Sequence, residues 1–218
     1  IFFYFIILFT LSTINNKSLV NKLEIILGIK EIIVKGLETQ EKNMIESQLN
    51  YLINKNIFLL KKSLIETEIN KNSFIESAEI KKIYPSKLLI KTKKAELLAI
   101  TIKDNKEHYV GSNGKFILKK NIKDETKLPI IFGNFRTKEF LLLIREFSTE
   151  GFEPKNFKKF YYFQNKRWDV EIEEGVVVKL PRKNNLKAIK KLKIILENKE
   201  NVKYKSVDLR IANQIILN

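Results

Sequence analysis

The sequence contains no cysteine and only one histidine, His108, among its 218 residues. Without cysteine the chain can form no disulfide, thiolate nucleophile, iron–sulfur cluster or cysteine-bound zinc site. One histidine excludes a histidine metal cluster, and no G-x-S-x-G motif accompanies it to indicate a serine hydrolase. We therefore expect no catalytic residue, no cofactor and no metal site.

Proline and glycine are also scarce, with four and seven residues respectively. Together with 44% apolar and 30% charged residues, this composition excludes a low-complexity or collagen-like chain. The length is sufficient for one large domain or two small ones, each with a hydrophobic core. We therefore expect a folded protein.

Arginine is rare although the formal net charge is +16, because nearly all of the 41 basic residues are lysines. Arginine is the residue that binds phosphates and guanine edges in a forked geometry. The scattered lysines, with abundant isoleucine and asparagine, are typical of A- and T-rich codons. A lysine-rich nucleic-acid binder is one alternative interpretation, and a lysine excess also suits an anionic membrane surface.

Residues 1–14 form an apolar run without a charged residue. A membrane-spanning helix needs about 20 apolar residues, so the run has the length of a signal-peptide core. However, no small-x-small cleavage site follows it, and the sequence begins with isoleucine rather than methionine. We expect a truncated transmembrane helix over residues 1–14 and a juxtamembrane linker over residues 15–28.

The next 70 residues predict the order β-α-α-β-β. Strands are expected over residues 29–36, 74–84 and 87–94, the last two joined by a turn at Pro85. The first helix is expected to be capped by Thr39. Apolar residues at helical spacing predict the buried stripes of the two helices: Met44, Ile45, Leu49, Leu52 and Ile53 in the first, and Leu64, Ile65 and Ile69 in the second.

The second half predicts a mainly antiparallel sheet with two covering helices. Alternating residues and short polar connections predict strands over 157–163, 167–172 and 176–180. One helix is expected to be capped by Thr137 and the other by Asn184 or Asn185. Closing strands are expected over 207–210 and 214–217, which places the end of the chain at or near a sheet edge.

Several motifs in this order resemble a known family. The segment Ala78–Ile90, with its Tyr84-Pro85 turn, resembles a polypeptide-transport-associated (POTRA) domain. The later motifs resemble the FtsQ/DivIB family of bacterial division proteins: a strand and glycine turn over 108–117, the L-P-x-x-x-G segment 128–133, W-x-V at 168–170, G-x-x-V-x-L at 175–180, and D-L-R at 208–210.

The resemblance implies an α+β fold with a POTRA domain over residues 29–97 and a C-terminal β domain over 98–218. It implies a non-enzymatic divisome scaffold that links early and late septum-assembly proteins. Such a protein crosses the bacterial inner membrane once, with its bulk in the periplasm at the division septum. Its partners are FtsB and FtsL, with other division proteins on the POTRA domain. It binds no nucleic acid and no small-molecule substrate.

The resemblance also implies where the partner binds, because FtsB meets this family at and just after D-L-R. The corresponding residues are Arg210, Ile211, Ala212, Asn213 and Gln214. An exposed edge strand offers unpaired backbone groups for strand addition by a partner. Arg210 would pair with a partner carboxylate, and Ile211 would provide an apolar anchor.

Two other interpretations remain open at this stage. Asp208 and Arg210 could serve only to hold strands together. A POTRA-containing component of outer-membrane assembly or secretion is the alternative function for the same fold, and it predicts repeated POTRA units.

Overall fold

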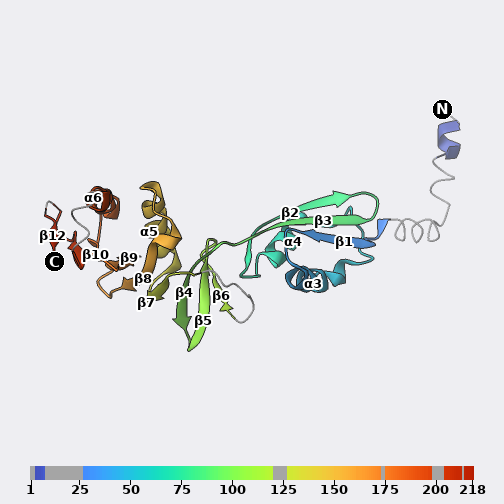
Figure 1. Cartoon of the computed structure of the whole chain (residues 1–218). Helices are drawn as coiled ribbons and strands as arrows, with labels where there is room; N and C mark the ends of the chain where they lie inside the picture. Colours follow the sequence, from blue (N-terminus) through green and yellow to red (C-terminus); the bar gives the residue numbers. More distant parts are fainter. Residues whose placement is uncertain (1–2, 8–26, 120–126, 173–174, 198–203, 213) are drawn as a thin grey trace. The chain divides into compact units, whose positions relative to one another are not determined.

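The computed structural model describes residues 3–7, 27–119, 127–172, 175–197, 204–212 and 214–218 (Figure 1). The chain divides into two compact units, Ile1–Lys94 and Ala95–Asn218. Residues 3–7 are helical, and within the described ranges no helix is both long and apolar enough to cross a membrane. Most of the expected transmembrane helix (1–14) and linker (15–28) lies outside the described residues, so both remain expectations.

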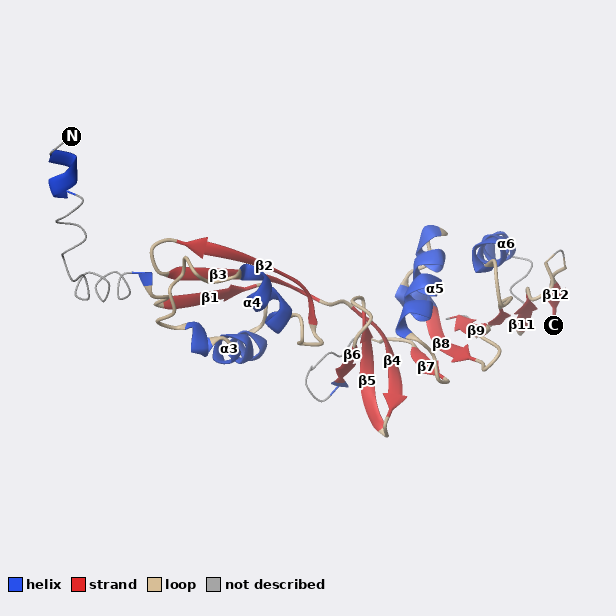
Figure 2. Ribbon diagram, turned by 180° about the vertical axis from the view of Figure 1, so that it is seen from behind, coloured by secondary structure: helices blue, strands red, loops and turns tan. Residues whose placement is uncertain are grey.

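The first unit has the predicted β-α-α-β-β order. Its elements are β1 (Glu31–Lys35), α3 (Thr39–Gln48), a 3-10 turn (Asn50–Leu52), α4 (Lys62–Ile69), β2 (Ile75–Ile83) and β3 (Lys87–Lys94). The sheet order is β1-β3-β2, with β1 parallel and β2 antiparallel to the central β3. Figure 2 shows α3 and α4 on the same side of this sheet.

Residues spaced four apart bury one side of each helix in this unit. Ile45 from the first helix, Leu49 directly after its end, and Ile65 and Ile69 from the second helix are fully buried, as the apolar periodicity predicts. The stripes are narrower than predicted, however. Met44 and Leu64 are exposed, since each lies one position before a buried isoleucine and therefore about 100° around the helix.

The second unit contains nine strands and two α-helices among its described residues. The elements are β4 (Leu97–Lys103), β5 (Lys106–Gly111), β6 (Phe116–Leu118), β7 (Ile130–Phe132), α5 (Thr137–Thr149), β8 (Phe157–Tyr162), β9 (Trp168–Ile172), β10 (Val177–Lys179), α6 (Asn185–Glu197), β11 (Ser206–Asp208) and β12 (Ile216–Leu217). The sheet order is β12-β11-β10-β9-β8-β7-β4-β5-β6. Five strand pairs are antiparallel and three are parallel, so the mainly antiparallel sheet is confirmed.

Both helices of this unit pack on one face of the sheet, as predicted (Figure 2). Phe140 and Phe147 from α5 and Leu192 from α6 are fully buried against Phe160 and Trp168. The rings meet mostly edge to face, with centroids 5.3 Å apart for Phe140 and Phe160. This core makes the sheet a rigid support for its edge strands.

The predicted helix caps at Thr39 and Thr137 are wrong. Each threonine is the first helical residue, and the capping positions are occupied by Glu38 and Arg136, neither of which caps with its side chain. A threonine inside the first turn cannot place its hydroxyl on the free backbone N–H groups as an N-cap residue does. In the second unit, α6 begins at Asn185, which is one of the two residues expected to cap this helix.

Candidate partner-binding site at the carboxyl-terminal edge

The last two strands of the chain form one edge of the nine-stranded sheet (Figure 1). β11 runs parallel to β10, and β12 pairs antiparallel with β11 through Val207↔Leu217 and Asp208↔Ile216. Val207 is buried, and Leu217 packs against the same core. The prediction that the chain ends at a sheet edge is therefore confirmed, although the final strand covers 216–217 rather than 214–217.

One side of β12 has no neighbouring strand in the described part of the sheet. Asn218 and Ser206 exchange both backbone hydrogen bonds, at 3.0 and 2.9 Å, toward β11. Residues along an antiparallel strand direct their backbone groups alternately to one side and the other. The N–H and C=O of Leu217 are therefore directed to the open side, where an added strand would bind.

The residues predicted to bind the partner lie in the loop between β11 and β12, not in the edge strand itself. Arg210, Ile211, Ala212 and Gln214 are all exposed, whereas Asn213 lies outside the described residues. The loop starts at the buried Leu209, whose N–H donates to the carbonyl of Lys179 at 2.9 Å. The structure thus brings four of the five predicted residues together at the edge.

A lysine from α6 also fixes this loop. The Nζ of Lys191 donates a hydrogen bond to the carbonyl oxygen of Ala212 at 2.6 Å. Sequence reasoning missed this contact, because nothing in the local pattern around Lys191 distinguishes it from the other lysines of the helix. The contact ties the loop to the helical layer that covers the core.

Arg210 already pairs with an acidic residue of its own segment. Its Nε donates to both carboxylate oxygens of Asp208, at 2.8 and 2.9 Å, and its Nη2 donates to Oδ2. The backbone N–H of Arg210 also donates to Asp208 Oδ1 at 3.1 Å. Asp208 and Arg210 therefore order the start of the loop rather than joining two strands, and two of the three guanidinium nitrogens are engaged before any partner binds.

This pair lies at the end of a row of charges across the sheet. Asp169 is opposite Lys179, which is opposite Asp208 on the next strand. Asp169 is buried and pairs with Arg167, whose Nε lies 3.1 Å from Oδ1. Cross-strand neighbours of opposite charge stabilise a sheet and disfavour a shifted register. The row thus helps to hold β11, and with it the edge strand, in place.

The Arg210 side chain, by hydrogen bonding to Asp208, lowers the pKa of that carboxyl group. A carboxyl group whose pKa is lower in the folded state than in the unfolded state stabilises the fold. This stabilisation is fully present above the unfolded-state pKa of about 4, and it is lost as the pH falls through the folded-state pKa. Asp208→Asn is therefore expected to destabilise the second unit by about 1–3 kcal/mol at pH 7. The difference from wild type should shrink steadily below about pH 4.

Urea unfolding of residues 27–218 at several pH values measures this difference. The single tryptophan, Trp168, is buried in the second unit, so its fluorescence reports that unit alone. Asp104→Asn is the matched control, because Asp104 is exposed on the β4–β5 turn. A constant difference between Asp208→Asn and wild type from pH 7 to pH 3 would contradict the role given to the pair.

Three isoleucines give the site its apolar character. Ile211 is 53% exposed in the loop, and Ile215 and Ile216 are exposed where the chain enters the edge strand. The sequence prediction did not include the last two residues as partner contacts, although both are large apolar residues next to the predicted binding segment. Within the described residues no group of three acidic or histidine side chains has the arrangement of a metal site.

The two units together define a class of protein: a POTRA domain followed by a sheet domain with an open terminal edge. The family model for an FtsQ-type POTRA domain matches residues 27–93. The family model for the C-terminal part of the cell division protein FtsQ/DivIB matches residues 99–210. The chain therefore belongs to the FtsQ/DivIB family of cell division proteins.

Individual members of this family are similar along most of the chain. The chain is 24% identical over 188 residues to a protein named cell division protein FtsQ from Rickettsia bellii (strain RML369-C), covering 85% of this chain and 70% of that protein. With the same coverage, it is 24% identical over 194 residues to the FtsQ protein of Rickettsia typhi (strain ATCC VR-144 / Wilmington) and 25% identical over 188 residues to that of Rickettsia felis (strain ATCC VR-1525 / URRWXCal2).

Proposed function

We propose that the chain is a non-enzymatic scaffold of the divisome that holds the FtsB–FtsL pair at the carboxyl-terminal edge of its second unit. In this proposal residues 1–14 belong to a helix that crosses the bacterial inner membrane, and residues 15–28 link it to the POTRA domain. The POTRA domain (29–97) and the β domain (98–218) lie in the periplasm at the division septum. Membership of the FtsQ/DivIB family supports the assignment to cell division.

The single observation that carries the partner assignment is the open side of β12. Its backbone groups at Leu217 are directed outward, and the neighbouring exposed side chains are isoleucines rather than charges. Proteins that protect an edge strand place lysine, proline or a bulge there. The terminal edge has an apolar side-chain surface instead, which favours strand addition by a partner.

The chemistry of the edge indicates what kind of segment binds. An extended partner segment would pair with the backbone of Leu217 and place apolar side chains on Ile211, Ile215 and Ile216. Arg210 remains nearly half exposed while it pairs with Asp208, so a partner carboxylate would share an existing ion pair. Apolar contact and backbone pairing, rather than a new salt bridge, are therefore expected to dominate the affinity.

Ile211→Glu tests this proposal, since it places a charge in the centre of the apolar surface. We expect residues 27–218 to retain the FtsB–FtsL pair in a pull-down, and Ile211→Glu to weaken binding about tenfold or more through burial of a carboxylate. Ile102→Glu is the matched control, because Ile102 is a 67% exposed isoleucine on β4, distant from β12 in the strand order. Equal binding by both variants would place the partner elsewhere.

Charge reversal at Arg210 is a weaker test than it first seems. Arg210→Glu would bring two carboxylates together and leave the buried Asp208 without its partner, so it would disturb the fold as well as the surface. Arg210→Gln keeps hydrogen-bond donors near Asp208 and is the better variant. It is expected to reduce binding less than Ile211→Glu.

A further inference from the structure

The first unit exposes a group of large apolar side chains at one end. Leu59 is 81% exposed and Leu64 is 64% exposed, although leucine is normally buried in a folded domain. Tyr51, Phe58 and Tyr84 are each more than half exposed beside them. We call this surface the loop-54–64 patch; it comprises residues 54–64 with Tyr51 and Tyr84.

The residues of this patch form one continuous surface. A single shallow groove of about 470 Å³ is lined by Tyr51, Leu59 and Leu64 together with Leu52, Leu60 and Ile65. The rings of Phe58 and Tyr84 stack with their centroids 4.5 Å apart. The Nζ of Lys82 donates to the carbonyl of Phe58 at 3.2 Å, which holds the loop against β2.

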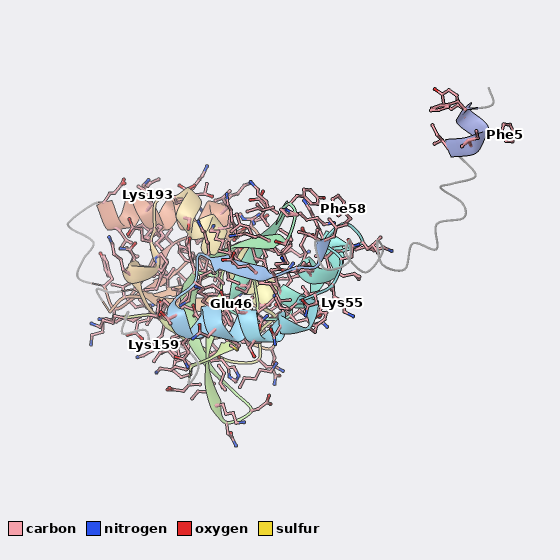
Figure 3. All side chains as sticks on the ribbon, turned by 90° about the vertical axis from the view of Figure 1, so that its right-hand side faces the viewer. Phe5, Glu46, Lys55, Phe58, Lys159 and Lys193 are labelled. Atoms are coloured by element: carbon pink, nitrogen blue, oxygen red, sulfur yellow. The ribbon has the colours of Figure 1, made fainter. Side chains whose placement is uncertain are left out.

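Lysines surround the apolar side chains, and one acidic side chain contacts the patch: Oε2 of Glu68 accepts a hydrogen bond from the hydroxyl of Tyr51 at 3.3 Å. Residues 27–30, 50–65 and 82–87 contain no aspartate or glutamate. Lys55, Lys61 and Lys62 are exposed, and none of them forms an ion pair with any residue that the structure describes. In Figure 3 Lys55 and Phe58 both project outward from this loop. The patch therefore combines exposed apolar groups with an excess of positive charge, carried by Lys55, Lys61 and Lys62.

The patch lies where the chain enters the first unit from the amino-terminal side. Gly28 forms a β-bridge with Asn56, and the N–H of Ile57 donates to the carbonyl of Leu27 at 2.9 Å. The N–H of Ile29 donates to the carbonyl of Lys55, also at 2.9 Å. The loop is thus hydrogen-bonded directly to the last residues of the proposed linker and to Ile29, which follows it.

We infer that the loop-54–64 patch binds the surface of an anionic phospholipid bilayer, with its leucines and aromatic rings at the headgroup boundary and its lysines on the phosphates. This inference rests on the proposed membrane location. If residues 1–14 lie in the bilayer, residues 15–26 span at most about 40 Å when extended and about 18 Å when helical. The entry point, and the patch with it, then lies within about 40 Å of the end of the membrane helix, which is near enough for the patch to reach the bilayer surface.

The chemistry of the patch favours a lipid surface over a protein partner. Interfacial membrane sites combine leucine and aromatic side chains with lysines that reach past them to anionic headgroups. Each lysine near such a surface contributes roughly a fivefold increase in binding. Lys55 and Lys61 line the groove itself, whereas lysine is depleted in the cores of protein interfaces.

The absence of cysteine from the chain permits a clean labelling experiment. A polarity-sensitive fluorophore is attached to Leu59→Cys, and the full chain is reconstituted in vesicles of about one third phosphatidylglycerol and two thirds phosphatidylethanolamine, or of phosphatidylcholine alone. Quenching by brominated lipid measures contact with the bilayer. Lys71→Cys is the control site, because Lys71 is exposed and lies at the other end of β2 from the patch residue Tyr84. The length of β2 separates Lys71 from Tyr84 by about 30 Å.

We expect strong quenching at position 59 only in the anionic vesicles and none at position 71 in either. A triple variant of the Leu59→Cys chain carries Lys55→Glu, Lys61→Glu and Lys62→Glu. In this variant the ratio of chains with the patch docked on the bilayer to chains with it undocked should fall by at least about fivefold per lysine. The same charge change at Lys71, Lys91 and Lys93, which lie outside the patch, should leave quenching at position 59 unchanged.

Alkaline carbonate extraction separates the two ways in which the inference can fail. Loss of the chain from the vesicles overturns the proposed membrane location and the inference together. Retention of the chain with no quenching at position 59 overturns the inference alone and indicates that a protein, not lipid, covers the patch. Equal quenching at positions 59 and 71 also overturns it, since the contact would then not belong to the patch.

Discussion

Replacing Leu217 with proline is expected to weaken binding of the FtsB–FtsL pair at least about tenfold relative to Leu217→Ala. Both variants lose the leucine side chain, which packs against the core of the second unit. Only proline removes the outward N–H and places its ring where an added strand would approach. The difference between the two variants therefore isolates the backbone contribution of the edge.

The comparison is made by titrating residues 27–218 of each variant with the purified pair. Proline is tolerated on an edge strand where its missing N–H faces solvent, so Leu217→Pro should retain the Trp168 fluorescence of the folded second unit. If the two variants bind equally, the partner does not pair with the backbone of β12. If neither folds, Ile211→Glu with its Ile102→Glu control still tests the same surface.

Replacing Gly133 with alanine is expected to destabilise the second unit by about 2–4 kcal/mol. Gly133 has a φ of +102°, and an added Cβ atom would lie 2.2 Å from the carbonyl oxygen of Tyr162. The left-handed conformation costs an L-residue about 1–2 kcal/mol, and the backbone clash forces β7 away from β8. Glycine is required here because the two parallel strands meet at this position.

Gly175→Ala is the matched control for this prediction. Gly175 has a φ of +81°, but apart from its chain neighbours no atom of the residues that the structure describes would lie within 4 Å of its added Cβ. It should cost only the conformational term, about 1–2 kcal/mol. Urea unfolding followed by Trp168 fluorescence measures both variants. Equal losses of stability would show that the contact with Tyr162 adds nothing to the strain.

Local patterns predicted much of the fold because the interactions involved are local. Ile65 and Ile69 repeat at helical spacing and are buried, and the strands at 157–162 and 168–172 are joined by a short polar connection. The parallel pairing of β10 with β11 is not a local property. It depends on α6, which returns the chain to the sheet, and no residue of either strand specifies it.

The glycine motif at 128–133 illustrates what a pattern alone leaves unexplained. The order of motifs indicated the family, but only the structure gives the physical reason for Gly133. The backbone of Tyr162 approaches Gly133 closely, and Tyr162 belongs to β8, which is separated from Gly133 in the sequence by α5. Similarly, Met44 and Leu64 seemed to belong to buried stripes. Their exposure could not be read from spacing, because a single apolar residue beside a stripe fits either orientation.

At the candidate site, the sequence indicated the region but not its local structure. The terminal edge and four exposed residues of the loop were predicted, whereas the strand is shorter than expected and begins after them. Arg210 was expected to meet a partner carboxylate, yet Asp208 is two residues away and occupies it. The hydrogen bond from Lys191 to Ala212 joins residues that are 21 positions apart in the sequence, and a periodic pattern of residues cannot predict such a contact.

Amide hydrogen exchange of residues 27–218, with and without the FtsB–FtsL pair, tests the central claim most directly. Outward N–H groups on β12 exchange readily in the free protein, and strand addition would give each a hydrogen-bond partner. We predict that binding of the pair protects amides over residues 210–218, including Leu217, and leaves the first unit unchanged. Binding of the pair with protection confined to another surface, and none over residues 210–218, would contradict the account.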